Sequence, residues 1–345
     1  MHSTKTNVSI DDFDSLITYP VQSQWTTPDP SRGPGPAEAG WFDGTYHHRT
    51  NVTHAQFSFS FTGTDVYIFG GAGPAFGWYK VTIDRTQHYT RSAYVDVTEE
   101  PAQTQSTRQH LLFHRSGLRG DKRHTVVVEN LGSQKHGEGT DLLVDLVKTT
   151  VDIAPAGAIL TNITLEETDP SLVYTGEWTE NVHNPLFSGG YSRYTNGDGA
   201  SVSLTFNATA IYIFGDKTDR HGLYTVSLDG APPETFNGVS GCGGAFAHAC
   251  EKDNTLVYFA GGQPLAEGEH TITVRNVPGE LGAYFDLDAI VLTKSTKYFP
   301  AYAIAAGIEA RDSGAQKLVD AQGVLWLLLV VGIFSFWQRK FAYSS

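Results

Sequence analysis

The sequence predicts an all-β protein with two tandem β-sandwich domains and an apolar helix near the C-terminus. Three observations lead to this prediction. A long internal repeat divides the chain, short apolar runs alternate with period two between turn residues, and one uncharged apolar run lies close to the end. No segment before that last run shows the 3.6-residue period of an amphipathic helix.

The repeat defines two duplicated domains. FTGTDVYIFG at 61–70 returns as FNATAIYIFG at 206–215, and 17 of the 43 pairs between 42–84 and 187–229 are identical. HTVVVEN at 124–130 matches HTITVRN at 270–276. Repeat units of solenoid proteins have only about 20–50 residues, so units of this length indicate whole domains. Trp25 and Trp178 also match, and we expect both in the cores.

The apolar runs of both copies are typical of strands. AQFSFSFTG places Phe57, Phe59 and Phe61 on one face of a strand, and SVSLTF does the same with its apolar residues. VYIFG, present in both copies, is continuously apolar, which predicts a strand covered on both faces. Pro155 and small neighbours mark the boundary between the copies.

These patterns predict five consecutive segments. They are a first sandwich, a second sandwich, a stalk, a transmembrane helix and a short tail, at 1–152, 157–297, 298–322, 323–337 and 338–345.

The segment 323–337, GVLWLLLVVGIFSFW, predicts a single membrane span. It carries no charge, and Arg339 and Lys340 follow it, which favours a cytoplasmic tail and an extracellular or lumenal location of both repeats. The alternative is a cleaved glycolipid-anchor signal, with 313–315 (Ser-Gly-Ala) as the attachment site and a glycolipid-anchored protein at the cell surface. The first residues lack the apolar core of a signal peptide, so a tail-anchored protein with cytosolic domains is a third possibility.

Two features favour the secretory pathway. Cys242 and Cys250 lie in a Gly-rich loop, where we predict a disulfide, with two unpaired thiols as the alternative. Four N-x-[ST] sequons predict N-glycosylation, at Asn7, Asn51, Asn162 and Asn207.

Charge excludes one class of partner. The chain has 24 Lys and Arg against 37 Asp and Glu, a formal net charge of −13. Nucleic-acid backbones require a basic surface, so we predict no nucleic-acid partner.

The order W…(F/Y)-x-G-x-Y…F-T-x-T…Y-I-F-G…Y-x-V-x-(I/L)-D…H-T-x-x-V-x-N resembles that of galactose-binding-like jelly-roll domains. Such domains occur in tandem in uncharacterised fungal single-pass membrane proteins, and the resemblance covers both repeats. It implies a jelly-roll fold for each sandwich. Relatives of that fold include carbohydrate-binding modules, which are usually non-catalytic and of which some hold a structural calcium.

Loop aromatics are the predicted ligand contacts, because sugar rings stack on exposed aromatic faces. Trp41 and Trp78 have no aromatic counterpart in the second copy, which favours a ligand role. Tyr46 and Tyr191 match each other, which favours a structural role and leaves them weaker candidates. The full set of candidates is Trp41, Tyr46, Trp78, Tyr191 and Tyr194.

Acidic residues on the first and last strands of each copy offer a possible structural calcium site, although solvated edge charges are the favoured interpretation, and we predict no other cofactor. The first and last strands of a jelly roll can be neighbours, so Asp12 with Asp145, and Glu167 with Asp288, could converge. The alternative is that these carboxylates are solvated charges on sheet edges.

The predicted function is carbohydrate recognition by a membrane-tethered protein at a cell wall or cell surface. No catalytic motif is present, so we predict that the protein is not an enzyme. A structural or protein-binding ectodomain is the alternative, and a carbohydrate-active hydrolase is the third hypothesis. The predicted partners are accordingly a carbohydrate or a surface protein, together with the membrane.

Overall fold

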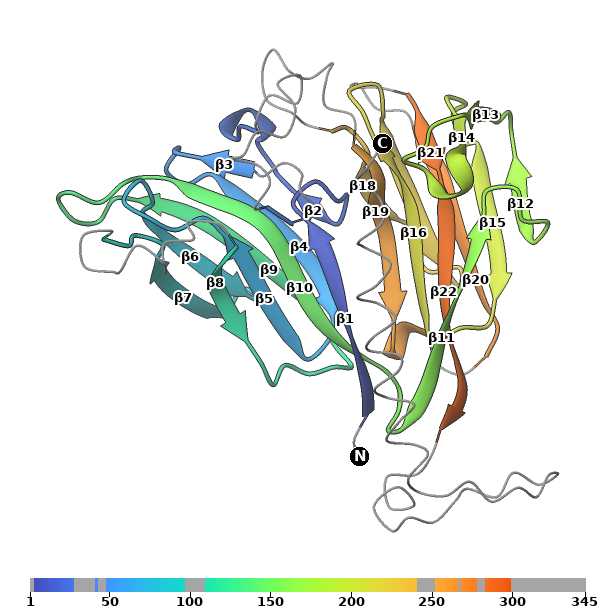
Figure 1. Ribbon diagram of the computed structural model, residues 1–345, viewed down its shortest axis with the longest axis horizontal. Helices are drawn as coiled ribbons and strands as arrows, with labels where there is room; N and C mark the ends of the chain where they lie inside the picture. The colour runs from blue at the N-terminus through green and yellow to red at the C-terminus, as the bar shows by residue number, and fades with distance from the viewer. Residues whose placement is uncertain are drawn as a thin grey trace, which may run out of the picture.

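The structure is a computed structural model, and it describes most of both repeats. The described residues are 3–27, 41–42, 48–96, 109–240, 252–265, 268–277 and 283–298. They form two β-sandwiches side by side (Figure 1). The prediction of an all-β protein with two sandwiches is confirmed.

Two antiparallel sheets form the first sandwich. One sheet has the order β1-β10-β5-β8, with β3 also paired to β10, and the other has the order β2-β4-β9-β6-β7. The first sheet consists of β1 (Ser3–Asp11), β3 (His48–Thr50), β5 (Asp65–Gly70), β8 (His110–Arg115) and β10 (Leu142–Pro155). The second consists of β2 (Ile17–Thr18), β4 (Gln56–Thr62), β6 (Trp78–Ile83), β7 (Gln87–Ser92) and β9 (Arg123–Gly132).

The second sandwich repeats this order. Its sheets are β11-β22-β16-β19 and β12-β15-β20-β17-β18, and a short sheet β13-β14-β21 lies beside them. The first comprises β11 (Ala158–Glu166), β16 (Ala210–Lys217), β19 (Lys252–Gly261) and β22 (Ala289–Tyr298). The second comprises β12 (Leu172–Thr175), β15 (Ser201–Phe206), β17 (Leu223–Leu228), β18 (Glu234–Asn237) and β20 (His270–Val277), and the third β13 (Thr179–Val182), β14 (Tyr191–Thr195) and β21 (Phe285–Leu287).

The period-two pattern places the core residues as predicted. On β4, Phe57, Phe59 and Phe61 are all buried while the residues between them are partly exposed. Such alternation buries one face of each sheet between the two layers of a sandwich.

Matched polar contacts also recur in both sandwiches. Asp84 and Asp229 each end a strand with a φ of 52°. Their carboxylates pair with His124 (Nδ1–Oδ2 2.9 Å) and His270 (2.7 Å). Asn7 and Asn162 each accept a 2.8 Å hydrogen bond from a threonine hydroxyl of the neighbouring strand. Both copies therefore keep the same turn and edge contacts as well as the same sheets.

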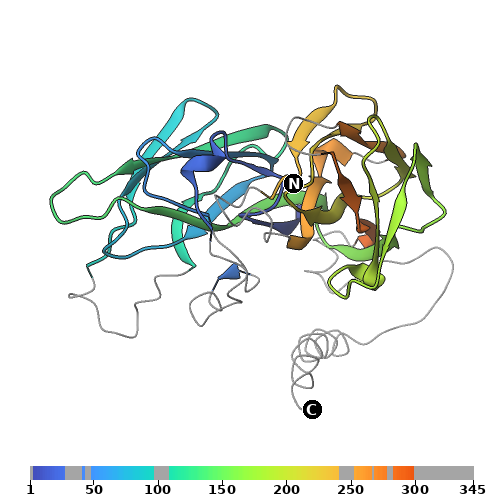
Figure 2. The ribbon, with the colours of Figure 1, turned by 90° about the horizontal axis from the view of Figure 1, so that it is seen from above.

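The two sandwiches are in contact through β1 on one side and β16 and β19 on the other (Figures 1 and 2). Leu256 joins the core cluster of the first sandwich, and its N–H donates to Asp14 Oδ1 at 2.8 Å. Lys252 Nζ lies 2.6 Å from Asp11 Oδ1, and both side chains are buried. The interface thus combines an apolar contact with a buried ion pair.

The C-terminal prediction lies beyond the described residues. The proposed stalk, apart from Tyr298, the segment 323–337 and the tail belong to this part of the chain. Within the ranges that the structure describes, no helix is long and apolar enough to cross a membrane.

Candidate functional site

An open groove of about 670 Å³ lies on the second sandwich, and its walls come from β12, β13 and β14. Its lining residues are Tyr174, Gly176, Trp178, Thr179, Glu180, Val182 and Arg193. We call this the β12–β14 groove.

Strand pairing brings the polar residues of the groove together. In the antiparallel pair β13–β14, Glu180 lies directly opposite Arg193, and Val182 lies opposite Tyr191. Directly opposite residues point to the same face of a sheet. The Glu180–Arg193 pair and the Val182–Tyr191 pair therefore lie on the same face of the sheet, and Glu180, Arg193 and Val182 line the groove.

Two aromatic rings form the floor of the groove. The Tyr174 and Trp178 rings pack edge to face, with centroids 4.9 Å apart at 69°. Trp178 Nε1 donates to the carbonyl of Thr175 at 3.2 Å, which fixes the indole. Both rings are only partly buried, so they offer a preformed aromatic surface to solvent.

Arg193 joins the rings to the charged pair. Its guanidinium carbon lies 5.0 Å from the centre of the Tyr174 ring, and its Nη2 donates to Glu180 Oε1 at 3.0 Å. The hydrogen bond to Glu180 raises the pKa of Arg193, and burial raises the pKa of the Tyr174 hydroxyl. At neutral pH the groove therefore carries the Arg193 cation and a neutral Tyr174 ring.

This combination suits a polyhydroxylated ligand. A sugar ring can stack its C–H face on an indole or phenol ring, while its hydroxyls bond to guanidinium and carboxylate groups. A groove lined by rings with a few oriented polar groups is the usual form of a small-ligand site.

The structure places the two predicted tyrosines of the second copy differently. Tyr191 lies on the groove face of β14, opposite Val182, and is 43% exposed. Tyr194 alternates to the other face, where its ring centroid lies 5.9 Å from that of Tyr284.

The candidates of the first copy do not form a common site. Trp41 is buried in the core cluster of the first sandwich, so its ring faces protein. Trp78 is half-buried, donates from Nε1 to Glu138 Oε2 at 2.7 Å and lies 5.5 Å beneath Lys135 Nζ. Tyr46 lies outside the described residues.

Sequence reasoning missed the main residues of the groove. Trp178 was assigned to the core because it matches Trp25, and neither Glu180 nor Arg193 was singled out. The alignment of the two repeats carried one signal for this site. It matches Arg193 with His48, two residues after the matched tyrosines Tyr46 and Tyr191.

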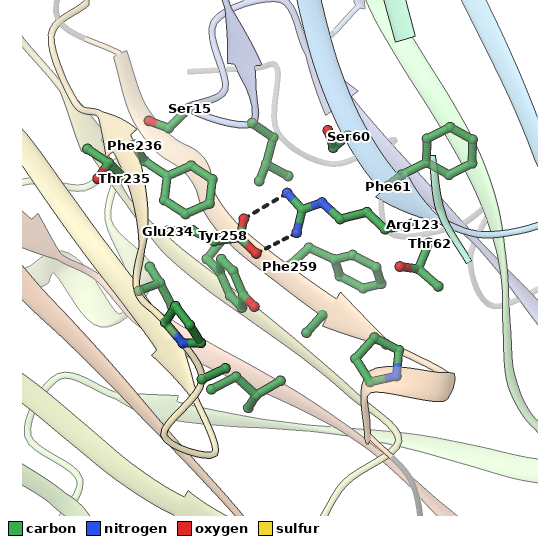
Figure 3. Close-up of a pocket in the computed structure, with 18 of the residues that line it drawn as sticks. Ser15, Ser60, Phe61, Thr62, Arg123, Glu234, Thr235, Phe236, Tyr258 and Phe259 are labelled. Carbon is green, nitrogen blue, oxygen red and sulfur yellow. Dashed lines mark hydrogen bonds and ion pairs between the residues drawn. The ribbon is translucent and has the colours of Figure 1, made fainter. Parts of the chain in front are cut away.

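A second hollow, of about 510 Å³, lies between the two sandwiches. Figure 3 shows Arg123 of the first sandwich bound to Glu234 of the second, with oxygen–nitrogen distances of 2.5 and 2.7 Å. The nearby Phe236 ring already stacks on Tyr224 and meets Tyr258 edge-on. These three rings pack against one another within the second sandwich, and the Arg123–Glu234 pair joins the two sandwiches across this cleft.

The first and last strands bring the predicted carboxylates together within each sandwich. The Asp12 N–H donates to the Asp145 carbonyl at 3.3 Å, and Asp12 Oδ2 lies 2.5 Å from His48 Nδ1. Asp145 accepts the Phe42 N–H at 3.0 Å, and Asp288 accepts the Ser188 N–H at 2.9 Å.

Burial is the main cause of the pKa shifts of these carboxyls. Burial raises the pKa of Asp145 and of Asp288 to about 7 and also raises the pKa of Asp12 and Glu167. In the described part of the chain, no three or more His, Cys, Asp or Glu side chains are placed to hold a metal ion. The geometry gives the predicted calcium no ligand set there. The alternative of solvated edge charges also fails, because all four carboxyls are buried.

The predicted modification sites fall into two groups. Cys242 and Cys250 lie outside the described residues. All four sequon asparagines are exposed: Asn7, Asn51, Asn162 and Asn207.

The chain is similar to parts of proteins that are named for carbohydrate chemistry. No protein-family model matches it. Over 182 residues it is 26% identical to an A type blood alpha-D-galactosamine galactosaminidase of Flavonifractor plautii, covering 52% of this chain and 15% of that protein. Over 112 residues it is 35% identical to an A type blood N-acetyl-alpha-D-galactosamine deacetylase of the same organism, covering 32% of this chain and 13% of that protein.

Among solved structures, a family 35 carbohydrate binding module from Clostridium thermocellum is 14% identical, with a TM-score of 0.26. The match covers 38% of this chain and 98% of the module. The chain spans about one seventh of the length of the two curated relatives that it matches.

The sequence-based prediction that the protein is not an enzyme is wrong by this comparison. Both curated relatives are named for enzymes that act on amino sugars. The absence of a familiar catalytic motif misled the prediction, because catalytic carboxylates of carbohydrate-active enzymes converge in space and leave no fixed sequence spacing.

Proposed function

We propose that this protein recognises glycans that end in a galactose-type amino sugar, and that the β12–β14 groove binds them. The observation that carries the proposal is the half-exposed Tyr174–Trp178 ring pair beside Arg193 and Glu180. The sugar class is supported by the names of the two curated relatives, which concern galactosamine and N-acetylgalactosamine.

Each groove residue has a distinct task in this proposal. The Trp178 indole stacks on the apolar face of the sugar ring. Arg193 donates hydrogen bonds to ring hydroxyls, and Glu180 accepts from hydroxyls or from the ammonium group of galactosamine. Tyr191 and Val182 extend the surface toward a second sugar.

Calorimetric titration of the full chain with methyl galactosaminide, methyl N-acetylgalactosaminide and methyl glucoside tests this function. We expect saturable binding of at least one galactose-type amino sugar and a loss of about tenfold or more in affinity for Trp178→Ala, equal to about 1.4 kcal/mol. Val173→Ala is the matched control, because Val173 is more exposed than Trp178 and adjoins Tyr174 on β12. Equal binding by Trp178→Ala and the parent chain would remove the groove from the proposal.

A second candidate function is catalysis on the same sugars, which the enzyme names of both relatives favour. Incubating the full chain with an α-galactosaminide and with an N-acetylgalactosaminide, and measuring released sugar and acetate, tests it directly. Product above a no-protein control supports catalysis, and binding without product restricts the chain to recognition.

We further propose that both sandwiches lie outside the cell or in a lumen, tethered by segment 323–337. The charge-free run followed by Arg339 and Lys340 and the exposed sequon asparagines support this location. An N-glycosidase shift in gel mobility is the expected result, and an unchanged mobility would contradict it.

A further inference from the structure

The outer face of β5 and β8 in the first sandwich is an apolar patch. The second sandwich has an equivalent patch, its twin, which packs against the first sandwich. The cross-strand register places His114 beside Tyr67 and Leu111 beside Phe69. It places Phe259 beside Tyr212 and Leu256 beside Phe214 in the same way. We call Tyr67, Phe69, Leu111 and His114 the β5–β8 patch; its twin is Tyr212, Phe214, Leu256 and Phe259.

The twin shows what such a patch binds. Tyr212, Phe214 and Phe259 pack against the core cluster of the first sandwich, which includes Val8 and Ile10 of β1. The Tyr212 hydroxyl also lies close to the side chain of Thr6. The covering element is therefore the face of β1 formed by Thr6, Val8 and Ile10.

The second sandwich carries the same covering face on β11. Asn7 pairs with Thr150 on β10, and Asn162 pairs with Thr293 on β22, so the two edge strands are in equivalent register. Thr161, Ile163 and Leu165 thus correspond to Thr6, Val8 and Ile10, and we call them the β11 face.

The β5–β8 patch and the β11 face are exposed, whereas the equivalent patch on β16 and β19 and the equivalent face of β1 are covered. Leu111 is 46% exposed against 4% for Leu256, and Ile163 is 39% exposed against 2% for Val8. Among the residues that the structure describes, one chain thus has an exposed patch on the first sandwich and an exposed matching face on the second.

We propose that the β5–β8 patch of one chain docks on the β11 face of a second copy, repeating the contact that joins the two sandwiches within a chain. The contact is heterologous, so it leaves a patch and a face free at the ends and adds copies head to tail. Tyr67 is then expected to lie close to Thr161, as Tyr212 lies close to Thr6.

The intermolecular contact should be weaker than the internal one. The internal interface adds the buried Lys252–Asp11 pair and the Leu256–Asp14 hydrogen bond. On the patch side, Lys148 lies 5.5 Å from the Phe69 ring, so a charged head group borders the apolar surface. We expect association that depends on concentration rather than a permanent assembly.

Analytical ultracentrifugation of the full chain from about 1 μM to about 1 mM tests the proposal. All samples contain the same mild detergent, so that the apolar segment 323–337 does not drive association. The average mass of the parent chain should rise with concentration, whereas Leu111→Glu and Ile163→Glu should each remain monomeric. Val173→Glu, an exposed change on β12, should behave as the parent chain.

Mixing the two variants gives the decisive result. The Leu111→Glu chain keeps its β11 face and the Ile163→Glu chain keeps its β5–β8 patch, so together they can form a single contact and a 1:1 dimer. A monomeric parent chain at every concentration, unchanged association by either variant, or a mixture that stays monomeric overturns the proposal. Sugar titrations are read separately, because neither variant lies in the β12–β14 groove.

Discussion

The two sandwiches contain the same aromatic arrangement, in which the tryptophan is buried in the first sandwich and partly exposed in the second. In the first, the Tyr19 ring meets Trp25 at 5.1 Å and stacks on His48 at 4.1 Å. In the second, the Tyr174 ring meets Trp178 at 4.9 Å and lies 5.0 Å from the guanidinium carbon of Arg193.

The framework that holds both arrangements is the same. Tyr19 donates to the carbonyl of Asp12 at 2.9 Å, and Tyr174 donates to the carbonyl of Glu167 at 2.7 Å. The difference lies in the charged partner. His48 turns inward to the buried Asp12 carboxylate, whereas Arg193 turns outward to the exposed Glu180.

The two copies of the repeat thus use the same arrangement of side chains in two different ways. The buried Trp25 and His48 rings contribute packing energy to a core, and the partly exposed Trp178 ring with Arg193 offers a ring and a charge to a ligand. The second sandwich is consequently the better candidate for ligand binding, although its Trp178 aligns with the core residue Trp25.

The largest expected effect is on stability and separates Trp25 from Trp178. Trp25→Ala removes a ring that is 1% exposed and should destabilise the first sandwich by about 3–5 kcal/mol. Trp178→Ala removes a half-exposed ring and should cost about 1–2 kcal/mol. Denaturant unfolding followed by circular dichroism measures both, and equal costs would contradict the contrast between the buried and the partly exposed tryptophan.

The next effect concerns pH and the matched carboxyls Asp145 and Asp288. Burial raises the pKa of each to about 7, from an ordinary value near 3.8. The folded protein therefore binds more protons than the unfolded chain between these values, so stability falls as the pH rises from about 4 to about 7.

Thermal unfolding at pH 5 and pH 8 tests this sign. We expect a lower midpoint at pH 8, and a smaller difference in Asp288→Asn, whose side chain does not titrate. The contacts of Asp84 with Lys122 and His124 lower its pKa to about 2, against the opposing effect of burial. Asp84 therefore changes the stability only below pH 4 and serves as a comparison. A midpoint that rises from pH 5 to pH 8 would contradict the account.

A binding effect without a stability effect is expected for the outward charged pair. Arg193→Ala should weaken binding of the amino sugar by about tenfold, because the hydrogen bonds of the guanidinium are lost. Its effect on unfolding should stay below about 1 kcal/mol, since an exposed ion pair contributes little. Calorimetry and denaturation of the same preparation measure both values, and Arg91→Ala on β7 is the exposed arginine control.

The smallest effect is expected at the exposed ion pair between the sandwiches, and the buried ion pair of the same contact is its comparison. Arg123→Ala removes the exposed pair with Glu234 and should change the free energy of unfolding by about 0–1 kcal/mol. Lys252→Met, which leaves Asp11 without its buried partner, should cost about 3–5 kcal/mol. Equal effects in denaturant unfolding would contradict the division of the interface into exposed and buried pairs.

The sequence predicted the sheets well because their signals are local. Phe57, Phe59 and Phe61 alternate on β4 as the period requires, and the repeat made each strand visible twice. VYIFG illustrates the limit of such a pattern. On β16 its outer residues pack against the other sandwich, while on β5 Tyr67 and Phe69 border the exposed Leu111 and His114.

The candidate site was less predictable because it depends on which copy is covered. Trp41 has no aromatic partner in the second repeat, yet it is core, and Trp178 has one, yet it lines a groove. Neither outcome follows from spacing alone. The pairing of Glu180 with Arg193 arises from the strand register of β13 and β14, which no residue pattern in this chain encodes.

An NMR titration of the ¹⁵N-labelled full chain with methyl galactosaminide and methyl N-acetylgalactosaminide tests the central contrast most directly. The indole Nε1–H signals of Trp25 and Trp178 are assigned with Trp→Phe variants. The account predicts a saturable shift of the Trp178 signal while the Trp25 signal stays in place. A Trp178 signal that does not move with either sugar, or a Trp25 signal that moves in its stead, would contradict it.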